Sequence, residues 1–461
     1  MSRKMYNYKI LILFSVLFLM SFSISVKAEV ISLEQAVQTA IENNHHLKAK
    51  KLDVEHSKKE KEKAKTHFLP QFTFSQSAER GDEPSYVFSR YLQQGYLPPQ
   101  YLLYPQSIGD TGAVNNFNTH LRITQLIWAG GAVRAAVKEA SAGERATAAI
   151  YNYERERTSA QVARSYLEVI RLKKQMIVLE QTEKALKAAL KKTKDLYEQG
   201  FVVNADVLRV EVQLKDVQKE KIALKNAITL ARYNLARQMG IDGNNPPDVV
   251  DGLSQFKILP LKPLGYYLKQ VEVSHPIIKA LKQQQKAAGH EIRRRIADFL
   301  PKFGAVADYQ WNRDTSAHRA SGYVVGLSLK WEIGDGLSRH LNVVQARIKR
   351  NQVEEQLYDT KDKLKLSVRK AWLDIQTSKK QIDVASTEVK QATESFKVAL
   401  DRFSNGLTTV DDMLGTEAIL KKARSDYVSA LTDYAESYIE LGLAVGRSRL
   451  FIKKVQQELL K

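Results

Sequence analysis

The same short pattern occurs twice in this chain, and that internal repeat constrains the fold more than any other feature. The segment His67–Phe72 (HFLPQF) returns 231 residues later as Asp298–Phe303 (DFLPKF). Farther along, the offset falls to 206, and residues 162–240 align with residues 368–446 without a gap. Identical pairs in this stretch include Gly200 with Gly406, Asp206 with Asp412 and Glu211 with Glu417. The chain is therefore predicted to contain two copies of one structural unit.

The first copy is longer than the second. The difference between the two offsets leaves about 25 additional residues around Gly81–Phe117. This stretch is rich in tyrosine and proline: Tyr86, Tyr91, Tyr96, Tyr101, Tyr104, Pro84, Pro98, Pro99 and Pro105. Because proline interrupts helices, we predict a long loop here, matched in the second copy only by the short segment Asn312–Ala320.

Alternation with a period of two residues predicts a pair of strands in each copy. In the second copy, apolar and polar residues alternate over 303–311 and again over 323–331, with aromatic residues towards the ends. The first copy shows a weaker form of the pattern at Phe72 and Phe74 and at Leu121, Ile123 and Ile127. This is typical of tilted strands in a membrane, with apolar side chains facing lipid. A soluble two-hairpin sheet is the alternative.

A helix is predicted before each pair of strands, over about Leu33–Thr66 and Leu264–Ala297. The Leu-Pro elements should end these helices, because proline disfavours helix at the preceding residue. Pro70 and Pro301 are therefore candidate structural turns.

A second, very long helix should follow each pair of strands. Glycine turns lead into it, and we align Gly131 with Gly336 as structural turns at an offset of 205. In the second copy, apolar residues recur every seventh position, each followed by a small residue three positions later: Val368, Ile375, Ile382, Val389, Phe396 and Phe403, with Ala371, Ser378, Ala385, Ala392 and Ala399. This spacing predicts left-handed supercoiling with a neighbouring helix. The chain should turn at Asn405-Gly406 and return as a shorter helix to about Val445.

The predicted boundaries follow from these patterns. Residues 1–28 resemble a secretory signal, with a basic start, an apolar centre and small residues at Val26 and Ala28; an uncleaved anchor is the alternative. The mature chain is then divided into the first repeat, a proline-rich linker, the second repeat and a C-terminal tail: 29–240, 241–263, 264–446 and 447–461.

Composition excludes several classes of function. The chain has no cysteine, which rules out disulfides, thiolate metal sites and cysteine catalysis. Its formal charge of +20 is spread among interspersed acidic residues, which is more typical of a solvated helix surface than of nucleic-acid binding. No phosphate-binding loop or metalloprotease motif is present. We therefore expect neither an enzyme nor a resident metal or cofactor.

Two copies of a strand pair give four strands, which cannot form a closed sheet, and open edges are not tolerated in hydrocarbon. Two chains would supply eight strands and three chains twelve. Physical reasoning alone predicts a multimer without choosing between these numbers.

The paired Leu-Pro elements, the Gly-Gly turns and the two glycine-containing helical tips resemble the outer-membrane efflux (TolC-type) family, over about residues 29–450. The resemblance implies a mainly α-helical fold with a small membrane β part: a homotrimer whose twelve-stranded β-barrel continues as a periplasmic α-helical barrel. It also implies an outer-membrane location and a passive exit duct for efflux or type I secretion. Its partners would be a periplasmic adaptor protein and, through it, an inner-membrane pump. A periplasmic coiled-coil scaffold without channel activity is the alternative.

The same resemblance suggests site residues at the two tips. Those implicated in adaptor docking are Gly200, Phe201, Gly406, Leu407 and Thr408, although the glycines could simply end helices. The candidate gate residues are Asp412, Asp206, Tyr197 and Phe403. Asp412 could instead stabilise the start of a helix. The sequence departs from the family's best-known member at Gly415 and Thr408, so the gate is not expected to close through the same contacts.

Overall fold

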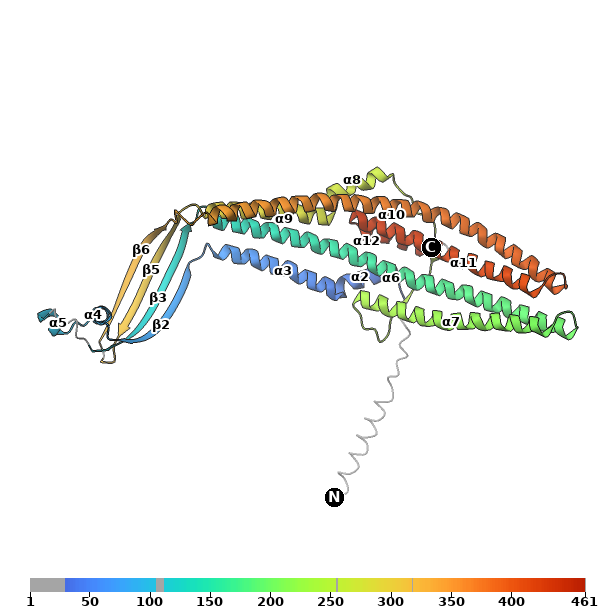
Figure 1. The fold of residues 1–461 in the computed structure, drawn as a ribbon, viewed down its shortest axis with the longest axis horizontal. Coiled ribbons are helices and arrows are strands. Elements are labelled where there is room, and N and C mark those ends of the chain that lie inside the picture. Colours follow the sequence, from blue (N-terminus) through green and yellow to red (C-terminus); the bar gives the residue numbers. More distant parts are fainter. Residues whose placement is uncertain (1–29, 105–111, 254–255, 317, 461) are drawn as a thin grey trace, which may run out of the picture. The chain divides into compact units, whose positions relative to one another are not determined.

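The computed structural model describes residues 30–104, 112–253, 256–316 and 318–460 (Figure 1). The predicted signal segment, residues 1–28, lies outside this described part. The chain divides into two compact units, each built from several separate stretches of sequence. Among the described residues, the first unit comprises those within 30–49, 153–275 and 363–460, and the second comprises those within 50–152 and 276–362.

The predicted duplication is visible in the lengths of the helices. Equivalent helices in the two copies have 11, 22, 67 and 36 residues. In this order, the pairs are α2 (Leu33–Asn43) with α8 (Leu264–Ser274), α3 (His45–Thr66) with α9 (Pro276–Ala297), α6 (Ala132–Glu198) with α10 (Ser338–Ser404), and α7 (Asn204–Met239) with α11 (Val410–Val445).

The first helix of each copy is interrupted, which corrects the prediction of one continuous helix. In the second copy the interruption is at His275, because the following Pro276 forces the preceding residue out of helical geometry. In the first copy Asn44 occupies the equivalent position. Its side-chain oxygen accepts a hydrogen bond from the backbone N–H of Leu47 at 3.1 Å, so an asparagine cap begins α3 where proline begins α9.

Four strands form an antiparallel sheet in the order β2-β3-β5-β6, and the short strands β1 (Val30–Ile31) and β4 (Asp248–Val249) pair in parallel as a separate sheet. The first copy contributes β2 (Gln71–Gly81) and β3 (Val114–Trp128). The second contributes β5 (Lys302–Arg313) and β6 (Arg319–Lys330). The two hairpins are joined through β3 and β5, which leaves β2 and β6 as the edges within one chain.

The register confirms that the sheet has one apolar and one polar face. Residues paired across antiparallel strands lie on the same face. One such row runs Phe74, Leu121, Tyr309 and Tyr323, and the neighbouring rows on that face add Phe72, Ile123, Ala307, Val325 and Leu327. We call this the apolar face. The opposite face, called the polar face below, includes Ser75, His120, Gln310, Arg122, Asp308, Asn118 and Asn312.

Where the structure describes it, the additional segment of the first copy is not the irregular loop predicted from its prolines; residues 105–111, with Pro105, lie outside the described residues. It contains two short helices, α4 (Pro84–Gln93) and α5 (Pro99–Leu103), each with a proline at its first turn. Proline is tolerated there, because the first backbone N–H groups of a helix have no partner within the helix. The prolines were predicted to interrupt helices, whereas Pro84 and Pro99 begin them.

The turns before the two long helices correct the sequence alignment by one residue. Gly130 and Gly131 have φ angles of +59° and +84°, and Gly336 and Leu337 have φ angles of +59° and +72°. Gly336 is therefore equivalent to Gly130, and the offset of 206 already holds at this point. Leu337 occupies the position of Gly131 in a left-handed conformation that is unfavourable for a residue with a Cβ atom.

We expect Leu337→Gly to stabilise the protein by about 1 kcal/mol, because it removes left-handed strain. The reciprocal change Gly131→Leu should destabilise it by a similar amount. An added Cβ at Gly131 meets no atom within 4 Å, so backbone strain alone would be responsible. Thermal unfolding of the purified protein measures both effects. Equal midpoints for L337G, G131L and the unchanged protein would contradict this expectation.

Most of the heptad positions in α10 are buried: Val368, Ile375, Ile382 and Phe403 with the small residues Ala371, Ser378, Ala385 and Ala392, whereas Val389, Phe396 and Ala399 are half-buried. The segment expected to be a C-terminal tail contains a helix, α12 (Ser448–Leu459). Its side chains Phe451, Ile452 and Val455 are buried. Among the residues described, no helix combines the length and apolar content needed to span a membrane.

Candidate functional site

The two helical tips share one turn geometry. Gly200 and Gly406 have φ angles of +77° and +72°, and each ends a long helix. The following residue donates a backbone hydrogen bond back into the helix: Phe201 to the Leu196 carbonyl and Leu407 to the Arg402 carbonyl, both at 2.9 Å. This arrangement satisfies carbonyl groups at the helix end. It also leaves the side chains of Phe201 and Leu407 projecting outwards, 71% and 66% exposed.

Asp412 participates in the cap that begins α11. Its backbone N–H donates to the Thr409 hydroxyl at 3.1 Å, and its carboxylate accepts from the Thr409 backbone N–H at 3.4 Å. The carboxylate also accepts a hydrogen bond from Thr408 Oγ1 at 2.9 Å. Hydrogen bonds from Thr409 and Thr408 hold the pKa of Asp412 below its usual value. Asp412 is therefore an anionic helix-cap residue within one chain.

The first tip has a weaker version of this cap. Asp206 accepts a hydrogen bond from the backbone N–H of Val203 at 3.2 Å. Val203 replaces the equivalent Thr409 and cannot return a side-chain hydrogen bond. The start of α7 is therefore capped by one side chain instead of two.

The two aromatic gate candidates lie in different environments. Tyr197 is 46% exposed in the last turn of α6. Phe403 is only 1% exposed and packs in a cluster with side chains from all four helices of the tips: Ala189, Leu196, Val210, Val410 and Met413. Phe403 thus stabilises the packing of the two tips, and its ring does not project into open space.

Sequence patterns did not reveal an ion pair between the tips. Arg209 of α7 contacts Asp411 of α11 at 2.9 Å and Asp206 at 3.5 Å. The side chains of Arg209 and Asp411 are more than half exposed, so the contact contributes at most about 1 kcal/mol. No local signal could have identified this pair, because its members lie 202 residues apart.

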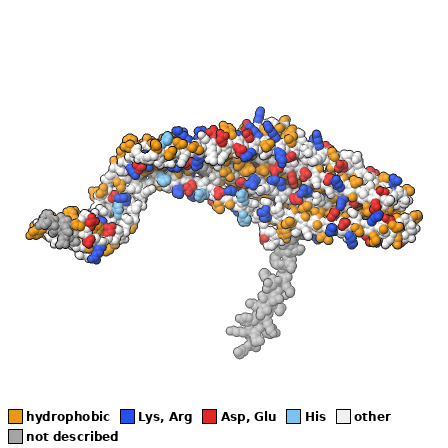
Figure 2. All heavy atoms as spheres, viewed as in Figure 1, with side chains coloured by type: hydrophobic (Ala, Val, Ile, Leu, Met, Phe, Trp, Pro, Cys, Tyr) orange, Lys and Arg blue, Asp and Glu red, His pale blue; other side chains and the backbone are white. Residues whose placement is uncertain are grey.

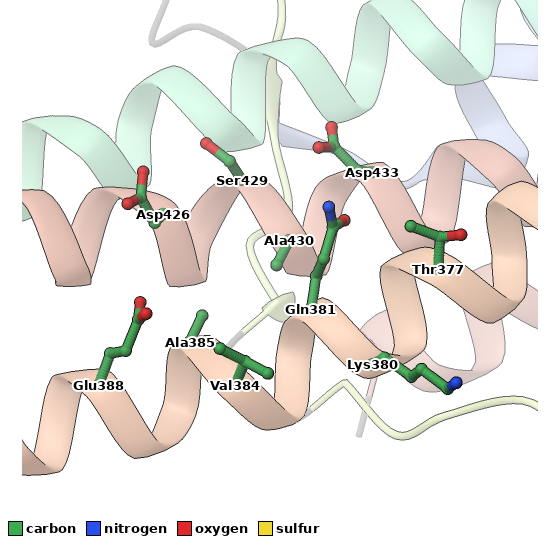
Figure 3. Close-up of a pocket in the computed structure, with 10 residues that line it drawn as sticks. All are labelled: Thr377, Lys380, Gln381, Val384, Ala385, Glu388, Asp426, Ser429, Ala430 and Asp433. Atoms are coloured by element: carbon green, nitrogen blue, oxygen red, sulfur yellow. The ribbon is translucent and has the colours of Figure 1, made fainter.

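A groove of about 470 Å³ lies between α10 and α11 (Figure 3). Its floor contains Ala385 and Ala430, and a second hollow beside it contains Ala392 and Ala423. The equivalent positions in the first copy carry larger side chains: Leu179, Leu224, Leu186 and Val217. Leucine and valine fill the space between α6 and α7, whereas alanine leaves it open in the second copy.

Polar side chains interact across the polar face of the sheet. Asp308 accepts hydrogen bonds from Arg122 Nε at 2.6 Å and pairs with His120 Nε2 at 2.8 Å. On the face shown in Figure 2, charges of both signs are interspersed over the helices instead of forming a patch of one sign. This distribution agrees with the solvated helix surfaces predicted from the sequence.

The model of the family described as "Outer membrane efflux protein" matches residues 36–241 and 267–447. The chain belongs to the outer membrane efflux protein family. It is an outer-membrane efflux channel protein whose helical part lies in the periplasm. The prediction of family, fold, function and location is thereby confirmed. Family members and structurally similar proteins are channels rather than enzymes.

Individual relatives are distant. The outer membrane efflux protein BepC of Brucella suis biovar 1 (strain 1330) is 20% identical over 420 residues, covering 90% of this chain and 85% of that protein. The outer membrane protein VceC of Vibrio cholerae has a similar structure, with a TM-score of 0.73, 17% identity and coverage of 90% of this chain and 96% of VceC. The CmeC outer membrane channel of Campylobacter jejuni gives a TM-score of 0.75, 15% identity and coverage of 95% and 94%.

Proposed function

We propose that three copies of this chain join their four-stranded sheets edge to edge into one closed ring of twelve strands. The observation that carries this proposal is the two-faced sheet with unpaired edges at β2 and β6. A sheet edge exposed to lipid leaves backbone groups without hydrogen-bond partners. Pairing β6 of one copy with β2 of the next removes every edge, and the family supports three as the number of copies.

In this assembly the apolar face contacts lipid and the polar face lines the duct. Val325 and Leu327 are both 71% exposed in the single chain, as is expected of side chains that contact lipid instead of a protein core. The polar face, with its His120, Arg122 and Asp308, would contact water. Transport is passive, because the chain carries no nucleotide-binding motif of its own.

The tips are the proposed docking site for a periplasmic adaptor, which connects the duct to an inner-membrane pump. Phe201 and Leu407 are exposed apolar residues next to sharp turns, and the fully buried core of a protein interface is more apolar than the rest of the surface. Gly200 and Gly406 shape the turns, and Thr408 positions the second one through its hydrogen bond to Asp412.

The gate is proposed to lie at the same end. Asp412 and Asp206 would bring carboxylates around the threefold axis, where they attract cations. Tyr197 is exposed and available for contact with a neighbouring chain. Phe403 would act indirectly, by holding the tips together from the core. The proposed segment boundaries remain 29–240, 241–263, 264–446 and 447–461, after a signal at 1–28.

Planar-bilayer recording of the purified protein tests the function. We expect trimers that conduct ions; a protein that forms neither trimers nor channels would favour the periplasmic scaffold.

We expect Asp412→Ala to raise resting conductance and to weaken block by divalent cations, because it removes three carboxylates from the proposed entrance. The matched control is Asp411→Ala, which removes a neighbouring carboxylate that contacts Arg209 instead. Both variants are measured in planar bilayers with and without added divalent ions. If D412A and D411A behave like the unchanged channel, Asp412 has only its capping role.

A further inference from the structure

The additional segment of the first copy, Glu83–Tyr104, lies against the polar face of the sheet. The sheet side chains that contact it in the interactions below belong to that face: Glu79 pairs with Asn116 across β2 and β3, and Asn312 pairs with Asn118 of β3 and with Ala320 of β6. We call Glu83–Tyr104 the insertion. It occupies the end of the sheet where β2 and β5 finish, away from the Leu-Pro elements in the sequence.

A buried amide network attaches the insertion to the sheet. Gln94 is 1% exposed, and its Nε2 donates to Asn116 Oδ1 at 3.0 Å and to the Asn115 carbonyl at 2.8 Å. Asn116 Nδ2 in turn donates to Asn312 Oδ1 at 3.0 Å. Buried amides are costly unless they are hydrogen-bonded. This network therefore favours one position of the insertion over a freely moving loop.

Two further contacts attach the insertion, one to β2 and the other to the loop between β5 and β6. Arg90 forms an ion pair with Glu79 of β2 at 2.7 Å. The ring of Tyr96 stacks on His318, with centroids 4.0 Å apart and planes 10° from parallel, and His318 Nδ1 pairs with Asp314 at 2.8 Å. The insertion thus spans from the first hairpin to the loop of the second.

The rest of the insertion presents apolar surface. Leu102, Leu103 and Tyr104 are 68%, 72% and 60% exposed, and Tyr101 packs against Tyr91 at 5.8 Å. A segment whose α4 part is held against a water-lined wall reduces the open cross-section, and exposed apolar side chains beside it raise the barrier to hydrated solutes.

We propose that the insertion is a built-in constriction at the outer mouth of the duct, which limits the size of the solutes that leave. This inference rests on the proposed function, because it requires the polar face to line the duct. Only the first copy carries the insertion, so a trimer places three of them around the mouth and leaves three short loops, Asp314–His318, between them. Attachment to the apolar face would have placed the segment in lipid instead.

Thiol labelling on intact cells tests this proposal, because the chain has no native cysteine. Ser328 lies on the polar face, paired with Gly304 nearer the helices, and is exposed. Cells that carry the S328C variant are treated with a small membrane-impermeant thiosulfonate and, separately, with a maleimide attached to a polyethylene glycol chain. Two variants are designed to open the mouth. The first shortens the insertion: the short loop sequence Asp314–His318 replaces everything between Gly81 and Val114. The second detaches the insertion by combining Arg90→Ala with Tyr96→Ala. Trimer recovery is checked for each.

We expect the small reagent to modify S328C in every background. The large reagent should modify it at least about tenfold faster when the insertion is shortened or detached. Rapid modification by the large reagent with the insertion in place would overturn the proposal, as would equally slow modification in all backgrounds. A different result tests the proposed function itself: if L327C on the apolar face is modified and S328C is not, the polar face does not line the duct.

Discussion

Replacing Leu407 with aspartate will abolish export while leaving the trimer and its membrane insertion intact. Leu407 is 66% exposed and its backbone N–H is bonded within the turn, so the side chain contributes little to folding. If the adaptor covers this side chain, the new carboxylate becomes buried without a partner. Such a charge costs on the order of 3 kcal/mol, or more than a hundredfold in affinity, at each tip.

The first measurement is the amount of solute retained by cells, for solutes that the unchanged strain expels and a channel-deletion strain retains. The second is the yield of chemical cross-linking between the adaptor and the channel. Phe201→Asp should have the same effect, because Phe201 occupies the equivalent position in the first tip. Leu407→Met is the matched control and should retain export. Normal export and cross-linking by L407D would remove the second tip from the docking surface.

Much of this fold could be predicted because the duplication repeats the same pattern of residues in two parts of the sequence. The lengths of α6 and α10 follow from the glycine turns at both ends, and the strand faces follow from the alternation at 303–311. The exceptions have local causes. Asn44 begins α3 through a side-chain hydrogen bond, which leaves a fainter sequence signal than Pro276 does. Leu337 adopts a glycine conformation that its residue type does not indicate.

The candidate site was predictable in position but not in detail. The tips were located by Gly200 and Gly406, since a left-handed residue at a helix end has a clear sequence signature. The burial of Phe403 depends on packing between four helices, and the pair Arg209–Asp411 joins residues 202 positions apart. The attachment of the insertion through Gln94 and Asn116 likewise depends on tertiary contacts, which a single sequence does not display.

The orientation of the sheet permits a test in which adjacent residues give opposite results. Leu327→Arg places a charge on the apolar face, three residues before the end of β6, where Leu327 pairs with Ala305. An arginine facing lipid costs up to about 2–4 kcal/mol in each chain, the value at the bilayer midplane, and a trimer contains three of them. We therefore expect outer membranes to contain little or no assembled trimer of the L327R variant.

Ser328→Arg is the matched control, because it introduces the same side chain one residue farther along β6. Ser328 faces the water-lined side in the proposed assembly, so S328R should insert and assemble normally. The amount of trimer in isolated outer membranes measures both variants, with total protein in the cell as the reference. If L327R assembles as well as S328R, the apolar face does not contact lipid; if S328R alone fails, the two faces are reversed. The strand period of two residues makes this comparison decisive, since neighbouring residues lie at nearly the same depth on one strand while their side chains point to opposite faces of the sheet.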